Sequence, residues 1–187
     1  ISGVNIYQAN ITAKYGGRIA SVVDIKAKSP YTDKFKLEGG VGVISSRLSW
    51  STPKIKEKLM LLAGGRIGFT DFLFPLLIPR LKNTKANFKD STVKLLYLPN
   101  ENNQLTYTHF FSQDFYQLDL ISSIENIVSS SNQYDFGTSN HTLRWLHSFD
   151  NETNLVGTFV HSNYLPQNLF PEIESTNVIR FESQIQY

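Results

Sequence analysis

The sequence predicts an all-β fold of antiparallel strands, of the kind that forms a transmembrane β-barrel. Apolar and polar residues alternate with a period of two along most of the 187 residues. Short polar turns and long connections follow one another between the alternating stretches, as in barrels that place tight turns on one membrane side. No apolar run approaches the roughly 20 residues that a membrane-spanning helix needs. A helical membrane protein is therefore excluded.

The alternation defines the strands in chain order, and the chain from residue 31 onward has room for about eight of them. In each stretch one parity is apolar and the other polar; His109 and His147 are exceptions, because they fall in the apolar parity. The alternating stretches are Phe35–Val43, Leu59–Thr70, Thr92–Tyr97, Gln104–Ser112, Thr142–Phe149 and Ile179–Tyr187.

The connections between the predicted strands alternate between short and long. Short turns are expected at Lys54–Lys58, Asn100–Asn103 and Asp150–Asn154, and longer connections at Phe72–Asn87, Ile121–Asn140 and Pro166–Thr176.

A soluble β-sandwich or lipocalin-like barrel would alternate in the same way, with its apolar side packed inward. Strand length and a belt of aromatic residues near the short turns favour the membrane barrel: Trp50, Tyr97, Trp145 and Phe149.

The composition argues against several other functions. The formal net charge of +2 gives no reason to expect a nucleic-acid partner. Without cysteine, the chain has no disulfide framework and no thiolate metal site. The 4 histidines form no zinc-binding pattern, and no phosphate loop or nucleophile motif is present. We therefore expect no enzyme, no metal and no cofactor.

The first thirty residues differ from the rest. A turn of Tyr15, Gly16, Gly17 and Arg18 precedes a valine-rich stretch that contains Asp24 and ends at Lys26. We expect Val22, Val23 and Ile25 to form a buried strand. This segment resembles the C-terminal end of the plug domain of TonB-dependent receptors, and Leu37–Trp50 and Lys58–Arg66 look like the first barrel strands of Bacteroidota-type members. The resemblance assigns residues 1–30 to the plug end and 31–187 to the N-terminal barrel strands.

The resemblance implies active import of a scarce substrate across the outer membrane of a Gram-negative bacterium. The partners would be outer-membrane lipid and TonB, which would engage an N-terminal region absent from this chain. Family members enclose the plug in about 22 strands, so the chain should be a fragment of a longer protein. A surface lipoprotein is a further partner in the glycan-importing branch. The Tyr-Gly-Gly-Arg junction departs from the Tyr-Gly-Ser-Arg-Gly-Ala turn of that branch, which weakens this case.

Three groups of residues are the candidates for function. The residues of the plug–barrel junction are Tyr15, Gly16, Gly17, Arg18 and Asp24. Five charged residues are expected to face the lumen and to contact the plug, neighbouring strands or a ligand: Arg66, Lys94, Arg144, Arg180 and Glu182. Three aromatic residues are expected to lie in loops and to stack on a substrate: Tyr116, Tyr134 and Phe136. Three alternative functions stay open: a transporter-like scaffold in an envelope complex, an eight-stranded anchor or adhesion barrel, and a soluble barrel that binds a small apolar ligand.

Overall fold

The computed structural model describes residues 2–8, 21–78, 84–118, 132–150, 152–168 and 176–186, the last of these by their backbone. The chain divides into two compact units, Ile1–Pro30 and Tyr31–Tyr187. These are the two parts into which the sequence analysis divided the chain. That they are a plug end and a barrel section stays a prediction.

The described part of the first unit is a pair of antiparallel strands, β1 (Gly3–Gln8) and β2 (Ser21–Lys26). Asp24 lies half-buried in β2, directly opposite Asn5. The expected burial of this strand is wrong: Val23 is 55% exposed and Ile25 is 59% exposed, because a two-stranded ribbon has no second layer of its own to cover either face. The junction residues Tyr15, Gly16, Gly17 and Arg18 lie outside the described residues.

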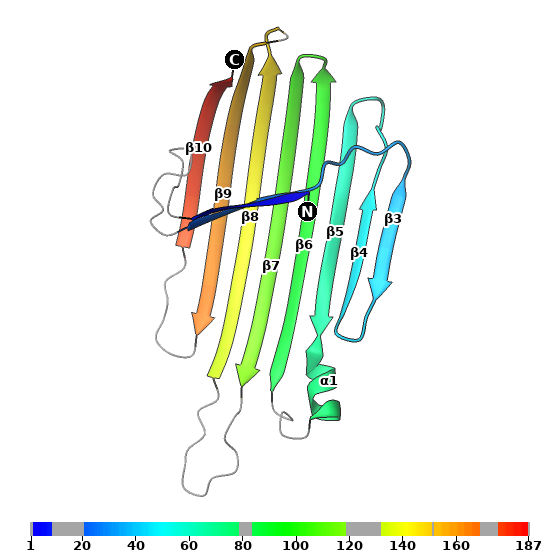
Figure 1. The fold of residues 1–187 in the computed structure, drawn as a ribbon, viewed down its shortest axis with the longest axis vertical. Coiled ribbons are helices and arrows are strands. Elements are labelled where there is room, and N and C mark those ends of the chain that lie inside the picture. The colour runs from blue at the N-terminus through cyan, green and yellow to red at the C-terminus, as the bar shows by residue number, and fades with distance from the viewer. Residues whose placement is uncertain are drawn as a thin grey trace, which may run out of the picture. The chain divides into compact units, whose positions relative to one another are not determined.

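The second unit contains a single sheet of eight antiparallel strands (Figure 1). The strands lie in the order of the sequence, so that each one pairs with its neighbours along the chain and β3 and β10 form the two edges. The predicted all-β, antiparallel fold is thereby confirmed for the described residues. The strands are β3 (Lys36–Val41), β4 (Ser45–Ser51), β5 (Leu59–Phe69), β6 (Lys85–Asn100), β7 (Asn103–Leu118), β8 (Asn132–Ser148), β9 (Asn154–Asn168) and β10 (Thr176–Gln186).

The three expected short turns are present between β4 and β5, β6 and β7, and β8 and β9. In the first turn Lys56 and Glu57 adopt positive φ angles of 48° and 59°, the left-handed conformation that a tight reversal needs. In the second, Oδ1 of Asn100 accepts hydrogen bonds from the backbone N of Asn102 at 3.2 Å and from Nδ2 of Asn103 at 2.8 Å. Asparagine favours turns because its side chain bonds the backbone locally.

The longer connections are shorter than the sequence suggested. The first contains a helix, α1 (Thr70–Leu77), and β6 already begins at Lys85; β8 begins at Asn132 and β9 continues to Asn168. The strands extend past the alternating residues because backbone hydrogen bonds to a neighbouring strand do not require apolar side chains. Among the described residues, no helix is long and apolar enough to cross a membrane.

Asp71 holds α1 against the start of β6. Its Oδ1 accepts a hydrogen bond from the backbone N of Ala86 at 2.6 Å, and its Oδ2 accepts one from Nδ2 of Asn87 at 2.8 Å. The hydroxyl of Thr70 donates to the carbonyl of Ala86. A carboxylate in the first turn also suits the positive end of the helix dipole. The sheet end opposite the short turns is thus tied across β5, α1 and β6.

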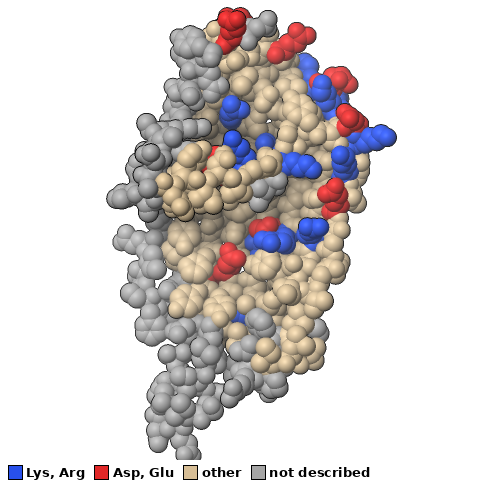
Figure 2. All heavy atoms as spheres, in the orientation of Figure 1, with Lys and Arg blue, Asp and Glu red and all other residues tan. Residues whose placement is uncertain are grey.

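The register gives the sheet two different faces. Residues directly opposite one another share a face, and odd-numbered residues of β5–β9 lie on the side that we call the apolar face. One cross-strand row on it is wholly apolar: Leu61, Leu95, Tyr107, Leu143 and Phe159. The even-numbered residues of these strands form the polar face. Figure 2 shows Lys, Arg, Asp and Glu side chains gathered over β3–β6 on the side turned to the viewer.

The most deeply buried apolar side chains lie on the polar face, close to the short turns. Met60 of β5 and Leu96 of β6 are directly opposite each other and are 1% and 2% exposed. Val156 of β9 is also buried on this face. The sheet therefore has buried apolar side chains at its short-turn end, where Lys94 and Arg144 are their neighbours on the polar face.

The Asp150–Asn154 turn provides a pH-dependent test of the structure. Oδ1 of Asp150 accepts hydrogen bonds from the backbone N of Glu152 at 2.9 Å and of Thr153 at 2.6 Å. Both bonds lower the pKa of Asp150, the one from Glu152 most, because they stabilise the charged carboxylate. Their contribution to stability is complete above the unfolded pKa of about 3.9 and is lost as the pH falls through the lower folded pKa.

We expect the carboxyl ¹³C chemical shift of Asp150 to titrate at lower pH in the folded protein than in the urea-unfolded protein. The turn should lose its order only below the ordinary titration range of aspartate. The same midpoint in both states would show that the two backbone bonds do not form.

Candidate functional site

The charged residues proposed from the sequence share one face of the sheet. Arg66, Lys94 and Arg144 lie on the polar face by the register of β5–β8, and Arg180 and Glu182 have the same parity in β10. They do not form one cluster. Asp90 and Lys94 are four residues apart on β6, so about 13 Å separates the Arg66–Asp90 position from the Lys94 position.

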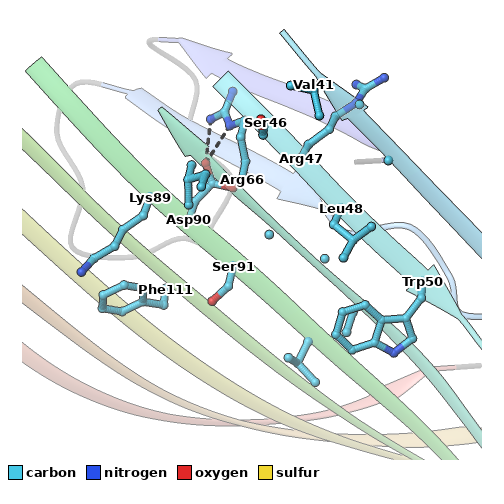
Figure 3. Close-up of a pocket in the computed structure, with 17 residues that line it drawn as sticks. Val41, Ser46, Arg47, Leu48, Trp50, Arg66, Lys89, Asp90, Ser91 and Phe111 are labelled. Atoms are coloured by element: carbon cyan, nitrogen blue, oxygen red, sulfur yellow. Dashed lines mark hydrogen bonds and ion pairs between the residues drawn. The ribbon is translucent and has the colours of Figure 1, made fainter. Parts of the chain in front are cut away.

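An ion pair between Arg66 and Asp90 lies at the centre of the site (Figure 3). The two residues are directly opposite each other on β5 and β6. Nε and Nη2 of Arg66 both lie 2.8 Å from Oδ2 of Asp90. The side chains are 54% and 25% exposed, so the pair contributes less than about 1 kcal/mol to folding. Its role is to orient the guanidinium rather than to hold the sheet together.

A phenylalanine ring orients Arg66 from a second side. The guanidinium carbon of Arg66 lies 4.7 Å from the ring centroid of Phe88, within the range of a cation–π interaction. The ring covers Gly68, its direct partner on β5, so closely that a Cβ at this position would collide with it. Glycine at position 68 is therefore what allows the Phe88 ring to lie over the strand and beneath the arginine.

Arg47 adds a second guanidinium group beside Arg66. It lies on β4 directly opposite Arg66, and its side chain is exposed. Among the described residues, Arg66 is ion-paired with Asp90, whereas no carboxylate is paired with Arg47. Like charges opposite each other on adjacent strands repel, so an anionic group bound between the two arginines would relieve this repulsion.

The three aromatic residues expected in loops lie instead in strands, and this part of the prediction is wrong. Tyr116 lies near the end of β7, and Tyr134 and Phe136 lie near the start of β8. The two strands remain paired as far as Leu118 and Asn132. Tyr116 and Tyr134 are directly opposite each other, and the rings of Tyr134 and Phe136 are stacked with centroids 6.2 Å apart. All three belong to the polar face.

The register joins the aromatic residues to the arginine pair. Phe88 is directly opposite Asp114, which is directly opposite Phe136. This row is adjacent to the row of Arg66 and Asp90, on the side of α1. We call the combined surface the polar-face site; it consists of Arg47, Arg66, Phe88, Asp90, Asp114, Tyr116, Tyr134 and Phe136.

The sequence analysis missed half of these residues. Arg47 alternates with Leu48 and Trp50 in β4, a signal that was available but was not used. Phe88 and Asp90 fall between the long connection expected at Phe72–Asn87 and the alternating stretch that begins at Thr92, and neither prediction includes them. A site of this composition, with two guanidinium groups, carboxylates and aromatic rings, can bind an anionic molecule that has a flat or apolar portion.

The histidines occupy the other face. His109, His141 and His161 are directly opposite one another on β7, β8 and β9, in the middle of the apolar face. Nδ1 of His141 lies 2.8 Å from the hydroxyl of Tyr107, and its Nε2 lies 3.3 Å from Oγ of Ser139. Within the described ranges, no group of three histidine or acidic residues is arranged to hold a metal ion.

No family model matches the chain, and neither the curated proteins nor the solved structures contain a match to it.

Proposed function

We propose that β3–β10 are membrane-spanning strands of an outer-membrane active transporter, with the apolar face toward lipid and the polar face toward the lumen. The observation that carries this proposal is the exposure of the apolar face. Many of its large side chains are exposed, among them Val41 of β3 at 89%, Ile67 of β5 at 55% and Phe159 of β9 at 41%. The described elements of this unit form one layer of sheet, and bare apolar area of this extent is the mark of an interaction with lipid or protein.

Strand length supports the same proposal. Strands β6 to β9 contain 16, 16, 17 and 15 residues, whereas strands of soluble proteins usually contain about 5 or 6. A tilted strand crosses a bilayer in about 9 to 11 residues. The additional residues would project beyond the hydrocarbon at the α1 end, where the apolar face carries Lys85, Gln117 and Gln133.

The polar-face site would then bind substrate inside the lumen. Arg47 and Arg66 would attract an anionic group, and the aromatic row would contact the remainder of the molecule. As the resemblance implies, TonB would pull on the plug and open a path past these side chains. This transport needs no covalent chemistry, so the residues act through binding and orientation.

The two tryptophans of the chain allow a direct test of membrane placement, because Trp50 and Trp145 both lie exposed on the apolar face. In the full-length protein, with all other tryptophans changed to phenylalanine, we expect phospholipids brominated on their acyl chains to quench both fluorophores strongly. A tryptophan introduced at Thr108, on the polar face, should instead be quenched by aqueous iodide.

Lack of quenching by brominated lipid at both Trp50 and Trp145 would contradict the proposed membrane placement and would favour the soluble barrel. Import is tested separately by comparing which solutes disappear from the medium of parent, deletion and TonB-deficient strains. A solute depleted by the parent alone supports transport. Correct membrane placement without any such solute would favour the scaffold.

A further inference from the structure

A groove crosses the apolar face over strands β3–β7 (Figure 3). Its volume is about 940 Å³. Most of its lining residues belong to the apolar face, and Arg47, Arg66 and Asp90 of the polar-face site also line it. Its floor consists of small residues, and its walls are large apolar ones. The floor is Gly39, Ser46, Ala63, Gly65 and Ser91; the walls are Leu48, Trp50, Ile67, Val93 and Phe111.

The groove follows from the order of side-chain sizes in one cross-strand row. Leu48, Gly65, Ser91 and Phe111 are directly opposite one another on four successive strands. Two large side chains therefore stand on either side of two very small ones. The outer strands of this row are about 14 Å apart, so the space over the two small residues is wide enough for a hydrocarbon chain.

A positive charge closes one end of the groove. Lys89 is directly opposite Ile67, and its ammonium group lies 5.9 Å from the ring centroid of Phe111. Among the described strand residues, Lys85 and Lys89 are the two Lys or Arg residues on the apolar face. The acidic residue on this face is Asp135, and its carboxylate already accepts hydrogen bonds from Nε2 of Gln113 at 3.1 and 3.2 Å.

We propose that this groove is a binding site for an anionic membrane lipid, with one acyl chain between Leu48 and Phe111 and the phosphate beside Lys89. The inference rests on the proposed function, which places the apolar face in the bilayer. Charge complementarity selects the ligand. The apolar groove ends at Lys89, and Lys85 lies four residues away on the same face of β6, so the groove matches a hydrocarbon chain attached to an anion. Zwitterionic lipid would fill the same groove without the net attraction, which is worth about a fivefold preference per lysine.

The test uses the full-length protein in mild detergent with equal amounts of phosphatidylglycerol and phosphatidylcholine that carry identical acyl chains. Native mass spectrometry then counts the lipids that each protein retains. We expect the wild type to retain phosphatidylglycerol about fivefold more than phosphatidylcholine. Lys89→Gln should bring this ratio close to one, and Lys89→Arg should restore it. Ser91→Leu fills the floor and should lower the retention of both lipids.

Lys36→Gln is the matched control, because Lys36 is an exposed lysine on the polar face of β3; its ratio should equal that of the wild type. Equal retention of the two lipids by the wild type, or an unchanged ratio in Lys89→Gln, would overturn the proposal. Because the side chain at position 89 is exposed, Lys89→Gln should fold and its lipid ratio can be measured even if Ser91→Leu does not fold. Quenching of Trp50 by brominated lipid without any lipid preference would reject the groove alone, whereas absence of quenching would reject membrane placement as well.

Discussion

If the apolar face meets lipid as proposed, Leu95→Arg is expected to destabilise the folded protein by about 2–4 kcal/mol, the cost of an arginine on the lipid side of a membrane barrel. Leu95 is surrounded on the apolar face by other apolar residues: Leu61 and Tyr107 are its cross-strand partners, and Val93 and Tyr97 are its neighbours along β6. The guanidinium would find no partner there. The loss is measured as the shift in free energy of unfolding of the full-length protein in lipid vesicles with increasing urea.

Thr92→Arg is the control on the same strand. Thr92 lies on the polar face between Asp90 and Lys94, where neighbouring charges of opposite sign balance. We expect its cost to stay below about 1 kcal/mol, because an arginine on the solvated face of the proposed barrel keeps its hydration. Equal destabilisation by the two variants would contradict the assignment of the faces.

Leu96→Ala is the second change with a large expected effect, of about 2–5 kcal/mol. Leu96 is 2% exposed and lies directly opposite Met60, which is 1% exposed. Truncation leaves a cavity against Met60 that the rigid strands cannot close. Urea unfolding of the full-length protein measures the loss.

Two comparisons make this prediction specific. Leu48→Ala, at a side chain that is 50% exposed, should cost less than half as much. Because Leu96 and Met60 are direct partners, the effects of Leu96→Ala and Met60→Ala should not add in the double variant. Additive effects would mean that the two side chains do not share one packed core.

The sequence predicts the two faces of the sheet well but the ends of its strands poorly. The parity of Leu61, Leu95 and Leu143 is visible because the side-chain period of a strand is two. The start of β8 at Asn132 is not visible, because Gln133, Asp135 and Gly137 lack the apolar signal while their backbone still pairs with β7. Helix α1 was missed because Pro75 argues against a helix, whereas Asp71 holds its first turn through contacts with β6 that no local pattern reveals.

The candidate site shows the same division between local and long-range information. Parity alone placed Arg66, Lys94 and Arg144 on one face. It did not show that Asp90 is the partner of Arg66 or that Phe88 lies over Gly68, because both depend on the register of β5 against β6. The groove on the apolar face depends on the register of four strands, and a single-residue shift would move every side chain of a strand to the other face.

The strictly sequential order of the sheet has a consequence for biogenesis. Each strand from β4 to β10 is added beside the strand that precedes it in the chain. Closing the loop between two consecutive strands costs little chain entropy, and contacts that are local in sequence form early. The order in which the strands are synthesised is therefore the same as their order in the sheet. The sheet can then be built one hairpin at a time, with each finished strand serving as the template for the next.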